Sequence, residues 1–237
     1  MTLSWSDPEP ESPWDADPEE RRARAADRPG GRSTIRGWMN AWGLGMSGGA
    51  LDRVYGSRKR ALFADLPDTV VEIGPGPGTN CRYLRPGTRL IAIEPAAHMH
   101  GGLRRAARRR GVELELHPRG AEILELEDQS VDAVIATLVL CSVDDPRAVL
   151  TEVRRVLRPG GRFIFIEHVA ADPGTRLHRL QGWVRKPWAW TFEGCELRRN
   201  TGAIIRAAGF EEVEEERFRV SWSPLPFSPH VAGVAIR

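Results

Sequence analysis

Three glycines at alternate positions follow a short apolar run, and they are the clearest chemical feature of the chain: Gly74, Gly76 and Gly78. Glycine permits φ > 0 and lets a bound molecule approach the main chain without meeting a Cβ. The pattern predicts a strand that turns sharply into a helix. We expect Thr79 or Asn80 to begin that helix, because both side chains cap helices well. The free N–H groups at such a helix start favour a polar or anionic ligand.

Two carboxylates are placed where they could bind that ligand. Glu94 closes a second apolar run twenty positions after Gly74, and Pro95 follows it. A carboxylate at this point of an α/β unit can accept hydrogen bonds from both hydroxyls of a ribose. Glu72 stands one residue before the end of the first apolar run. There it would repel a pyrophosphate and attract the ammonium group of a methionine.

The glycine spacing distinguishes two cofactor classes. A dinucleotide-binding loop needs glycines at its first, third and sixth positions. Counting from Gly74, the fifth position is Gly78 and the sixth is Thr79. Together with Glu72 and Glu94, this spacing favours S-adenosylmethionine over a dinucleotide. A Gly/Pro-rich turn without a ligand is the alternative.

The elements that must position these residues alternate between strand-like and helix-like patterns from Thr69 onward. Strands are expected at residues 69–73, 89–94, 112–116, 131–136 and 162–167. A helix is expected over residues 146–157, with Asp144 or Asp145 as its cap and Pro146 inside its start. This alternation indicates a parallel sheet with helices on both faces.

The last part of the chain adds a long helical stretch over residues 175–208 and two strands at residues 212–220 and 231–236. Placed as a hairpin, these strands complete a seven-stranded sheet with an antiparallel pair at its edge. The expected fold class is therefore α/β, a Rossmann-like doubly wound seven-stranded sheet with an antiparallel last strand and an N-terminal helical cap. Such an ending is typical of methyltransferases rather than dehydrogenases.

The chain of 237 residues is expected to form one domain behind two N-terminal segments. Its first twenty residues hold seven acidic residues, four prolines and no Lys or Arg. We therefore expect residues 1–32 to be a disordered acidic, proline-rich tail. Residues 33–66 combine apolar side chains with glycine breaks and predict a helical cap or lid. The domain itself is then residues 67–237.

The composition bears on whether the protein binds nucleic acid or metal and on where in the cell it is located. The net charge of +2 argues against a nucleic-acid surface, and the basic run from Arg104 to Arg110 is best explained as the solvated end of a helix. Cys81, Cys141 and Cys195 show neither a C-x-x-C pair nor a metal-ligand spacing with histidine, so no metal site is expected. Without a secretory or membrane-spanning apolar run, we expect a soluble cytoplasmic protein. The strong preference for arginine over lysine indicates a bacterial source with a GC-rich genome.

Ligands of open α/β sheets bind beyond the carboxyl ends of the strands. After the third strand, the residues expected near an adenine ring are Gly120, Ala121 and Glu122. After the fourth strand, the segment 137–143 is expected to run under the cofactor and to face the acceptor. Its predicted cofactor-binding residues are Thr137, Leu138 and Cys141. After the fifth strand, Glu167 and His168 bring two titratable groups to the same cleft.

Three sequence blocks between Asp132 and His168 are more specific than the glycines, and they read D-A-V-I-A-T-L-V-L-C-S-V, E-V-R-R-V-L-R-P-G-G and E-H-V-A. They resemble class I S-adenosylmethionine-dependent methyltransferases, and within them the animal microsomal alkyl-thiol S-methyltransferases. The resemblance covers roughly residues 50–237 and implies a class I methyltransferase domain over residues 67–237. Its later motifs are Trp183, Pro187-Trp188, Glu193-Gly194-Cys195-Glu196-Leu197 and Pro229-His230-Val231.

The chain departs from this family in two places. The family's N-terminal membrane anchor is replaced by the polar tail, so no membrane attachment is expected. The family's aspartate after the second strand is Glu94, which lengthens the ribose ligand by one methylene.

The resemblance implies methyl transfer to a small-molecule acceptor, most simply a thiol, in secondary metabolism or thiol detoxification. Transfer from a sulfonium is an in-line displacement, so catalysis is chiefly alignment in a dry cavity. His168 is the candidate general base, with the holding of a loop as its alternative, and Glu193 is a weaker candidate. The expected residues of the acceptor pocket, for which packing in the core is the alternative, are Tyr55, Trp183, Trp188 and Cys195.

Three other functions stay open. The acceptor atom could be oxygen or carbon, as in quinone or natural-product tailoring. RNA methylation has only the arginine run in its favour, and the sequence contains neither an N/D-P-P-Y/F nor a Pro-Cys motif. The third is a non-catalytic binding module that keeps the fold. The sequence leaves the oligomeric state open.

Overall fold

The computed structural model describes residues 48–192, 194–220 and 226–237. Its strands are β1 (Thr69–Ile73), β2 (Arg89–Ile93), β3 (Glu113–His117), β4 (Val131–Thr137), β5 (Leu157–His168), β6 (Glu212–Arg219) and β7 (Pro229–Ile236). Its helices are α3 (Gly48–Leu62), the 3₁₀ helix η1 (Thr79–Tyr83), α4 (Ala97–Arg110), α5 (Pro146–Val156), α6 (Arg176–Thr191) and α7 (Thr201–Arg206). The predicted tail and the first part of the predicted cap lie outside the described residues, and α3 is the part of the cap that is described. Within the described ranges, no helix has the length and apolar character that crossing a membrane requires.

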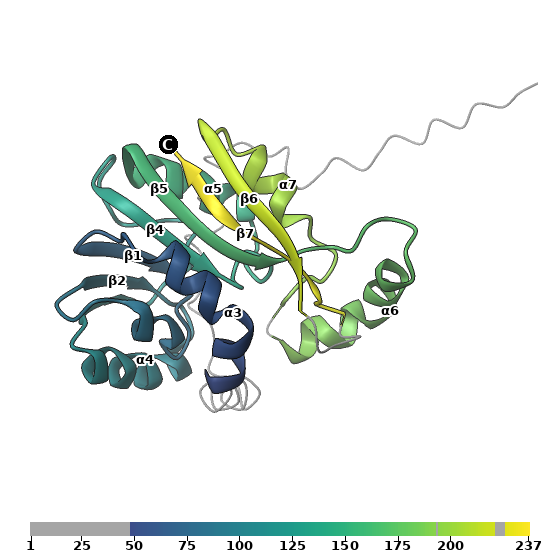
Figure 1. The fold of residues 1–237 in the computed structure, drawn as a ribbon, viewed down its shortest axis with the longest axis horizontal. Coiled ribbons are helices and arrows are strands. Elements are labelled where there is room, and N and C mark those ends of the chain that lie inside the picture. The colour runs from purple at the N-terminus through teal and green to yellow at the C-terminus, as the bar shows by residue number, and fades with distance from the viewer. Residues whose placement is uncertain (1–47, 193, 221–225) are drawn as a thin grey trace, which may run out of the picture.

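A seven-stranded sheet forms the centre of the molecule, in the order β3-β2-β1-β4-β5-β7-β6 (Figure 1). The strands from β1 to β5 pair in parallel, whereas β7 lies between β5 and β6 and runs antiparallel to both. The predicted Rossmann-like α/β sheet with an antiparallel last strand is confirmed. The predicted hairpin of the last two strands is also present, although β7 alone runs against the other strands.

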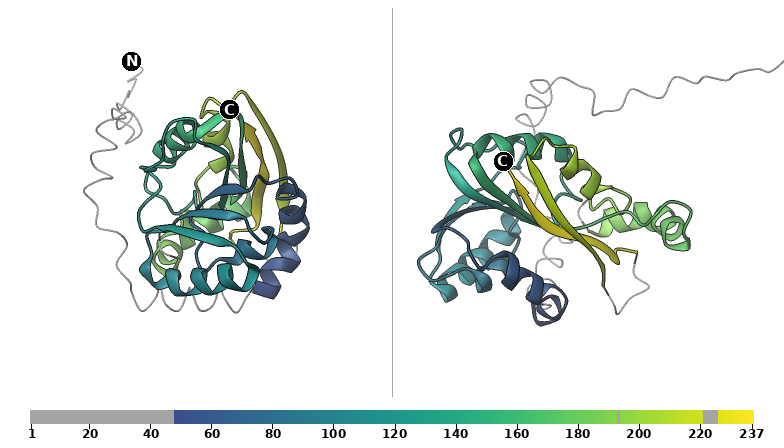
Figure 2. Two further views of the ribbon diagram at one scale, coloured as in Figure 1. Left: turned by 90° about the vertical axis from the view of Figure 1, so that its left-hand side faces the viewer. Right: turned by 45° about the horizontal axis from the view of Figure 1, so that its top comes forward.

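Helices cover both faces of the sheet, because successive side chains of a strand point to opposite faces. On one face, Val134 and Ala136 of β4 belong to a core that includes side chains of α5 and α7. On the other face, Ala133 and Ile135 pack with side chains of α4 and η1. Figure 2 shows the helices on both sides of the twisted sheet, and α6 extends beyond one end of it (Figures 1 and 2).

The start of α5 follows the predicted signals. The side chain of Asp145 accepts hydrogen bonds from the N–H groups of Arg147 and Ala148, at 2.9 and 3.0 Å. Pro146 occupies the first helical turn, where its missing N–H has no cost. Of the two predicted caps, Asp145 is therefore the one that the structure uses.

Two side chains of α5 then fix the segment between β3 and β4. Glu152 is buried and accepts a hydrogen bond from the N–H of Leu124 at 2.9 Å. Arg155 donates to the carbonyl oxygens of Leu124 and Leu126 at 2.7 and 2.8 Å, and it also pairs with Glu152 at 2.8 Å. These bonds hold in place the segment that carries the residues predicted to lie near adenine.

The helical stretch predicted over residues 175–208 is wrong as a continuous element. It consists of α6 and α7, and the described residues between them, 192 and 194–200, are irregular. Gly194 adopts a φ of 93°, which a right-handed helix cannot contain, and Asn200 caps α7 through the N–H of Ala203. The break allows Cys195 to turn back toward the sheet.

The predicted helix after the glycines is only the 3₁₀ helix η1, and neither Thr79 nor Asn80 caps it. Its N-cap is Gly78, without a side-chain hydrogen bond. Asn80 is fully buried, and its amide group bonds to other side chains instead. β5 also begins at Leu157 rather than at residue 162, because the chain continues into the sheet through its Pro-Gly-Gly sequence.

Gly233 allows β6 and β7 to pair closely. A Cβ here would overlap the carbonyl oxygen of Glu214 and lie 2.9 Å from Cα of Glu215. We expect Gly233→Ala to lower the free energy of unfolding by about 2–3 kcal/mol, because backbone atoms cannot move aside cheaply. In the control Gly101→Ala, the Cβ would meet only the end of Arg105, at 3.5 Å. The control should gain about 0.5–1 kcal/mol, because alanine favours a helix. Urea unfolding measures both, and equal midpoints would contradict the close pairing.

Candidate active site

The order of the strands reverses between β1 and β4, and ligands of open α/β sheets bind at the carboxyl ends of such strands. The loops 74–78 and 137–143 meet at this point. The N–H of Gly74 donates to the carbonyl oxygen of Ile93 at 2.9 Å. A Cβ on Gly74 would overlap the side chain of Val139. Glycine is therefore required at position 74 by the loop that follows β4.

The other two glycines have different surroundings. Gly78 packs against α4, where a Cβ would lie 2.8 Å from the Cβ of Ala106. Gly76 has a φ of 56°, and a Cβ there would meet no atom of the described residues within 4 Å. The open side of the glycine loop is therefore at Gly76, where a ligand can approach the main chain.

Glu94 ties the loop after β1 to the loop after β2. It is only 5% exposed, and its Oε2 and Oε1 accept hydrogen bonds from the N–H groups of Gly76 and Ala96, both at 2.9 Å. Burial raises the pKa of this carboxyl group, and the two backbone donors oppose the rise. Pro95 lies half-buried between Glu94 and Ala96. Each carboxylate oxygen keeps a lone pair that can accept a ribose hydroxyl.

A buried hydrogen-bonded chain runs from Lys59 through Asn80 to Glu72. Lys59 Nζ donates to Asn80 Oδ1 at 2.6 Å, and Asn80 Nδ2 donates to Glu72 Oε1 at 2.7 Å and to Thr137 Oγ1 at 2.9 Å. Burial raises the pKa of Glu72 and lowers that of Lys59. The second oxygen of Glu72, Oε2, is buried and has no hydrogen-bond partner among the described residues. It is the atom best placed to receive an ammonium group.

Glu167 fixes the loop after β4. It is fully buried, and its Oε1 accepts hydrogen bonds from the N–H groups of Val139 and Leu140, both at 3.1 Å. Burial raises the pKa of Glu167 to about 7. Leu138 adopts a φ of 58°, which costs a non-glycine residue on the order of 1–3 kcal/mol. Its N–H donates to the carbonyl oxygen of Ile166 at 2.8 Å. Strained residues of this kind cluster at functional sites.

Two cysteines and a histidine converge at the end of the same loop. Cys141, His168 and Cys195 are buried, and their potential ligand atoms all lie within 4.8 Å of one another. His168 Nε2 lies 2.9 Å from Cys195 Sγ, and Trp188 Nε1 donates to that sulfur at 3.3 Å. The carbonyl oxygen of Cys141 accepts a hydrogen bond from the N–H of Glu196 at 2.9 Å, which joins the two cysteine segments.

The two sulfur atoms of this cluster are not equivalent. The Cys141 thiol, the His168 ring and the Trp188 N–H all interact with the Cys195 sulfur, and they lower the pKa of Cys195. Donation to Cys195, together with burial, raises the pKa of Cys141. Negative charge in the pair therefore resides on Cys195, and the thiolate is the form of cysteine that reacts and binds metals.

Tyr55 reaches the same region from α3. Its hydroxyl group lies 2.8 Å from His230 Nε2, and His230 is paired with His168 across β7 and β5. The two histidine rings are T-shaped, with centroids 6.4 Å apart. Burial lowers the pKa of His230 to about 4, so its ring is neutral at pH 7. Tyr55 is only 3% exposed and packs in a hydrophobic cluster with Ile166 and Ala232, as its alternative role in the core would require, and its role in an acceptor pocket stays a prediction.

The aromatic residues predicted to form the acceptor pocket are divided between two faces of α6. Trp188 packs against Phe192 and Phe227, with ring centroids 4.2 and 5.3 Å away. Trp183 is 87% exposed, so the described structure places it on the surface and not in a pocket. Trp188 lies five positions further along the helix, which rotates the two side chains to different faces. Glu193, the second predicted base, lies outside the described residues.

The residues predicted to contact adenine lie beside the loop that precedes α5. Glu122 Oε1 accepts a hydrogen bond from the N–H of Asp144 at 3.2 Å. Ala121 is buried, and Gly120 is so close to the Glu122 carboxylate that a Cβ would lie 2.6 Å from its Oε2. Their role toward a cofactor stays a prediction.

The sequence assigned no role to Lys59 and expected Asn80 only as a helix cap. It also did not reveal the Cys141, His168 and Cys195 cluster. One signal for Lys59 was present, because it is one of only two lysines among 34 basic residues. The cluster had no signal in spacing, since each member is separated from the next by 27 residues. Only the pairing of β4 with β5 and the turn after α6 bring them together.

Comparison with known proteins indicates a single class of enzyme, the methyltransferases. Residues 71–165 match the methyltransferase domain family. The fold is similar to that of an S-adenosylmethionine-dependent methyltransferase, possible histamine N-methyltransferase, of Thermotoga maritima, at 24% identity and a TM-score of 0.56 over 81% of this chain and 97% of that one. It is also similar to the [4+2]-cyclase SpnF, at 17% identity and a TM-score of 0.60 over 89% of this chain and 99% of that one. The chain is an S-adenosylmethionine-dependent methyltransferase.

Its sequence relatives define the family within this class. Thiol S-methyltransferase TMT1B of Homo sapiens is 36% identical over 197 residues, which cover 78% of this chain and 81% of the relative. The same enzyme of Rattus norvegicus is 36% identical over 76% of this chain and 79% of the relative. Thiol S-methyltransferase TMT1A of Homo sapiens is 34% identical over 192 residues, 76% of this chain and 79% of the relative. The chain belongs to the TMT1 family of methyltransferases.

The residues at the carboxyl ends of β1 and β2 fit S-adenosylmethionine. The open side of the loop at Gly76 leaves room for a ligand against the main chain. Glu94 keeps lone pairs for the ribose, and the unpartnered Oε2 of Glu72 is available for the methionine ammonium. When bound, this cofactor supplies an electrophilic methyl group on a sulfonium.

Glu94→Ala should weaken the binding of S-adenosylhomocysteine at least tenfold. It removes hydrogen bonds to a charged group, which contribute about 1.5–3 kcal/mol each, and a tenfold change corresponds to about 1.4 kcal/mol. Glu94→Asp retains a carboxylate and should bind within severalfold of the unaltered protein. Glu113→Ala, at the exposed start of β3, is the control. Titration calorimetry measures all four proteins, and equal affinity of Glu94→Ala and the control would refute the assignment.

Proposed function

We propose that this protein transfers the methyl group of S-adenosylmethionine to the sulfur atom of a small-molecule thiol. The observation that carries this proposal is the buried cluster of Cys141, His168 and Cys195 at the end of the loop 137–143, which also contacts the glycine loop through Val139. The acceptor side of the site is thus lined by sulfur and imidazole groups. Relatives named as thiol S-methyltransferases support the same acceptor.

The chain's own residues hold the reactants in line. The carboxylates of Glu72 and Glu94 are positioned to bind the two polar ends of the cofactor, and Glu167 keeps the intervening loop in one conformation. Burial of the site excludes water, which strengthens every electrostatic interaction within it. His168 remains the predicted base. Because its Nε2 lies against Cys195 Sγ, Nδ1 is the nitrogen that could accept a thiol proton, and it has no hydrogen-bond partner in the described structure.

A thiol acceptor suits a site of this kind. With a reference pKa of about 8.5, a thiol is already about 3% thiolate at pH 7, so only modest activation is needed. Phenols and alcohols ionise at higher pH and would need a stronger base. The cytoplasmic location and the bacterial source inferred from the sequence stay predictions.

The acceptor class can be tested directly. The protein is incubated with S-adenosylmethionine and separate alkyl thiols, phenols and quinols, and the products are analysed by mass spectrometry. We expect methyl thioethers from the alkyl thiols and methylation of phenols and quinols at least 100-fold slower, because their oxygen atoms are not activated here. Glu94→Ala is the control for dependence on the bound cofactor. Methylated phenols or quinols without any thioether would refute the proposal that the acceptor atom is sulfur.

Two tryptophans of α6 provide a matched pair for the acceptor site. Trp188→Phe removes the N–H that donates to the Cys195 sulfur at 3.3 Å and retains an aromatic ring. We expect it to lower kcat/KM for the thiol about tenfold, which corresponds to the loss of one hydrogen bond to a charged group. Trp183→Phe alters an exposed side chain and should leave kcat/KM unchanged. Steady-state kinetics compares the two. Equal effects would show that Trp188 does not act through Cys195.

A further inference from the structure

The three residues of the sulfur and imidazole cluster come from three separate elements. Cys141 belongs to the loop after β4, His168 ends β5, and Cys195 lies in the segment between α6 and α7. All three are buried, with exposed fractions of 2, 4 and 8%. Two cysteine sulfurs and an imidazole nitrogen within 4.8 Å of one another form a donor set that methyl transfer by alignment alone does not require.

We propose that Cys141 Sγ, His168 Nε2 and Cys195 Sγ bind a zinc ion and leave its fourth coordination position open. Thiolate and imidazole donors select soft or borderline cations such as zinc, and three protein ligands with one open position are the arrangement of catalytic zinc sites. This differs from the expectation of no metal site, which was drawn from cysteine spacing alone.

The distances within the cluster are compatible with a tetrahedral ion. With Zn–S of about 2.3 Å and Zn–N of about 2.0 Å, the ligand atoms of such a site lie about 3.5–3.8 Å apart. His168 Nε2 and Cys195 Sγ lie 2.9 Å apart, and all three atoms lie within 4.8 Å. An ion therefore requires side-chain shifts of about 1 Å or less, which changes of side-chain torsion can provide.

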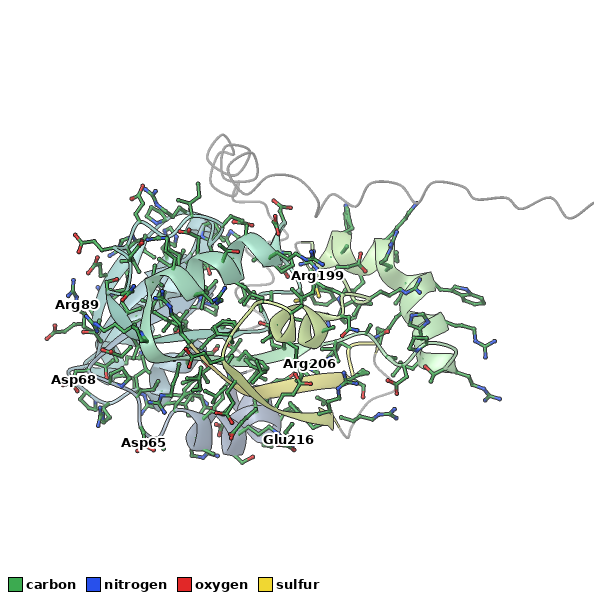
Figure 3. All side chains as sticks on the ribbon, turned by 90° about the horizontal axis from the view of Figure 1, so that it is seen from above. Asp65, Asp68, Arg89, Arg199, Arg206 and Glu216 are labelled. Carbon is green, nitrogen blue, oxygen red and sulfur yellow. The ribbon has the colours of Figure 1, made fainter. Side chains whose placement is uncertain are left out.

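The surroundings hold the two cysteines in place as metal sites require. Trp188 Nε1 donates to the Cys195 sulfur, and hydrogen bonds to the ligands orient and tune a bound metal. The N–H of Glu196 donates to the carbonyl oxygen of Cys141. Arg199, labelled in Figure 3, donates to the carbonyl oxygen of Leu140 at 2.6 Å and thereby holds the residue before Cys141.

Charge also favours a divalent cation. Zinc binds cysteine as thiolate and histidine as the neutral ring, so the two sulfurs balance the charge of the ion. The next residue, Glu167, is a fully buried carboxyl group, and its Oε2 has no hydrogen-bond partner among the described residues. Without a cation, an incoming thiolate would meet the negatively charged Cys195 sulfur and the buried Glu167 carboxyl group. With zinc bound, it meets an electrophilic ion.

The open position gives the ion a role, and this part rests on the proposed thiol methylation. An acceptor thiol binds the ion through sulfur as it enters, and its proton leaves with the solvent water that its entry displaces. Its sulfur then forms a bond to the methyl carbon while the carbon–sulfur bond of the sulfonium breaks, and that electron pair stays on S-adenosylhomocysteine. The product is a neutral thioether, which binds zinc more weakly than a thiolate and leaves. Activation by zinc would replace proton acceptance by His168.

Metal binding can be measured without any activity assay. The full-length protein is stripped with a chelator under a phosphine reductant and titrated with Zn²⁺ against a chromophoric competitor, and separately with Co²⁺. We expect one ion per chain and visible thiolate-to-cobalt charge transfer. Cys141→Ser and Cys195→Ser should weaken Zn²⁺ binding at least about 100-fold, since even changes around a ligand cost 10–100-fold. Cys81→Ser is the matched control, because Cys81 is equally buried and lies outside the cluster.

Three outcomes would overturn the zinc site. The first is that the unaltered protein binds no more Zn²⁺ than Cys195→Ser does. The second is that Cys81→Ser loses as much Zn²⁺ affinity as the two cluster variants. The third is a Cys141–Cys195 disulfide that persists under the reductant. Far-UV circular dichroism and the midpoint of urea unfolding of each variant confirm that the fold is intact.

A further measurement separates the site from the proposed function. Addition of a simple monothiol, 2-mercaptoethanol, should change the cobalt spectrum, because its sulfur occupies the open position. An unchanged spectrum would overturn the acceptor role while the metal site stands. Zinc binding together with an absence of thioether product from every thiol would overturn thiol methylation and leave the zinc site intact.

Discussion

The two hydrogen bonds from the N–H groups of Val139 and Leu140 to Glu167 are the interaction on which the site depends. They hold the loop after β4 in a conformation that includes the left-handed Leu138. Val139 then packs against Gly74, and Cys141 reaches the sulfur and imidazole cluster. One loop therefore sets both the shape of the glycine loop and the position of the acceptor residues. A change at Glu167 would displace both halves of the site together.

Buried carboxylates are the common device at this end of the sheet. Glu72 and Glu167 are each one residue before the end of a parallel strand, and Glu94 follows one. Each accepts a hydrogen bond from a backbone or side-chain amide N–H group. Those donors offset part of the cost of burial, which raises the pKa of all three. Fixed negative groups favour a cationic sulfonium over its neutral product.

The sequence predicted the fold well, because the strands from residue 69 onward are distinct apolar runs that end at glycine, proline or polar residues. It also singled out Gly74, Gly76 and Glu94, which the structure brings together at the carboxyl ends of β1 and β2, and their role toward the cofactor stays a prediction. It failed where long-range packing decides the structure. Asn80 was expected to cap a helix. Instead its side chain is buried, where it accepts a hydrogen bond from Lys59 and donates one to Glu72. Trp183 was placed in a pocket although the helix turns it outward, because aromatic content alone does not give the direction of a side chain.

The two ends of the site differ in the chemistry of their side chains, and this difference affects which methyl acceptor the site can bind. Carboxylate and backbone groups line the cofactor end, and they suit ammonium and hydroxyl groups. Cysteine, histidine and the N–H of Trp188 form the proposed acceptor end. A thiolate acceptor brings a negative charge toward the Cys195 sulfur, on which the negative charge of the cysteine pair resides. A site built only to repel its substrate would be a poor catalyst. A divalent cation among the same three atoms turns this repulsion into attraction and aligns the acceptor sulfur beside the loop that bounds the cofactor.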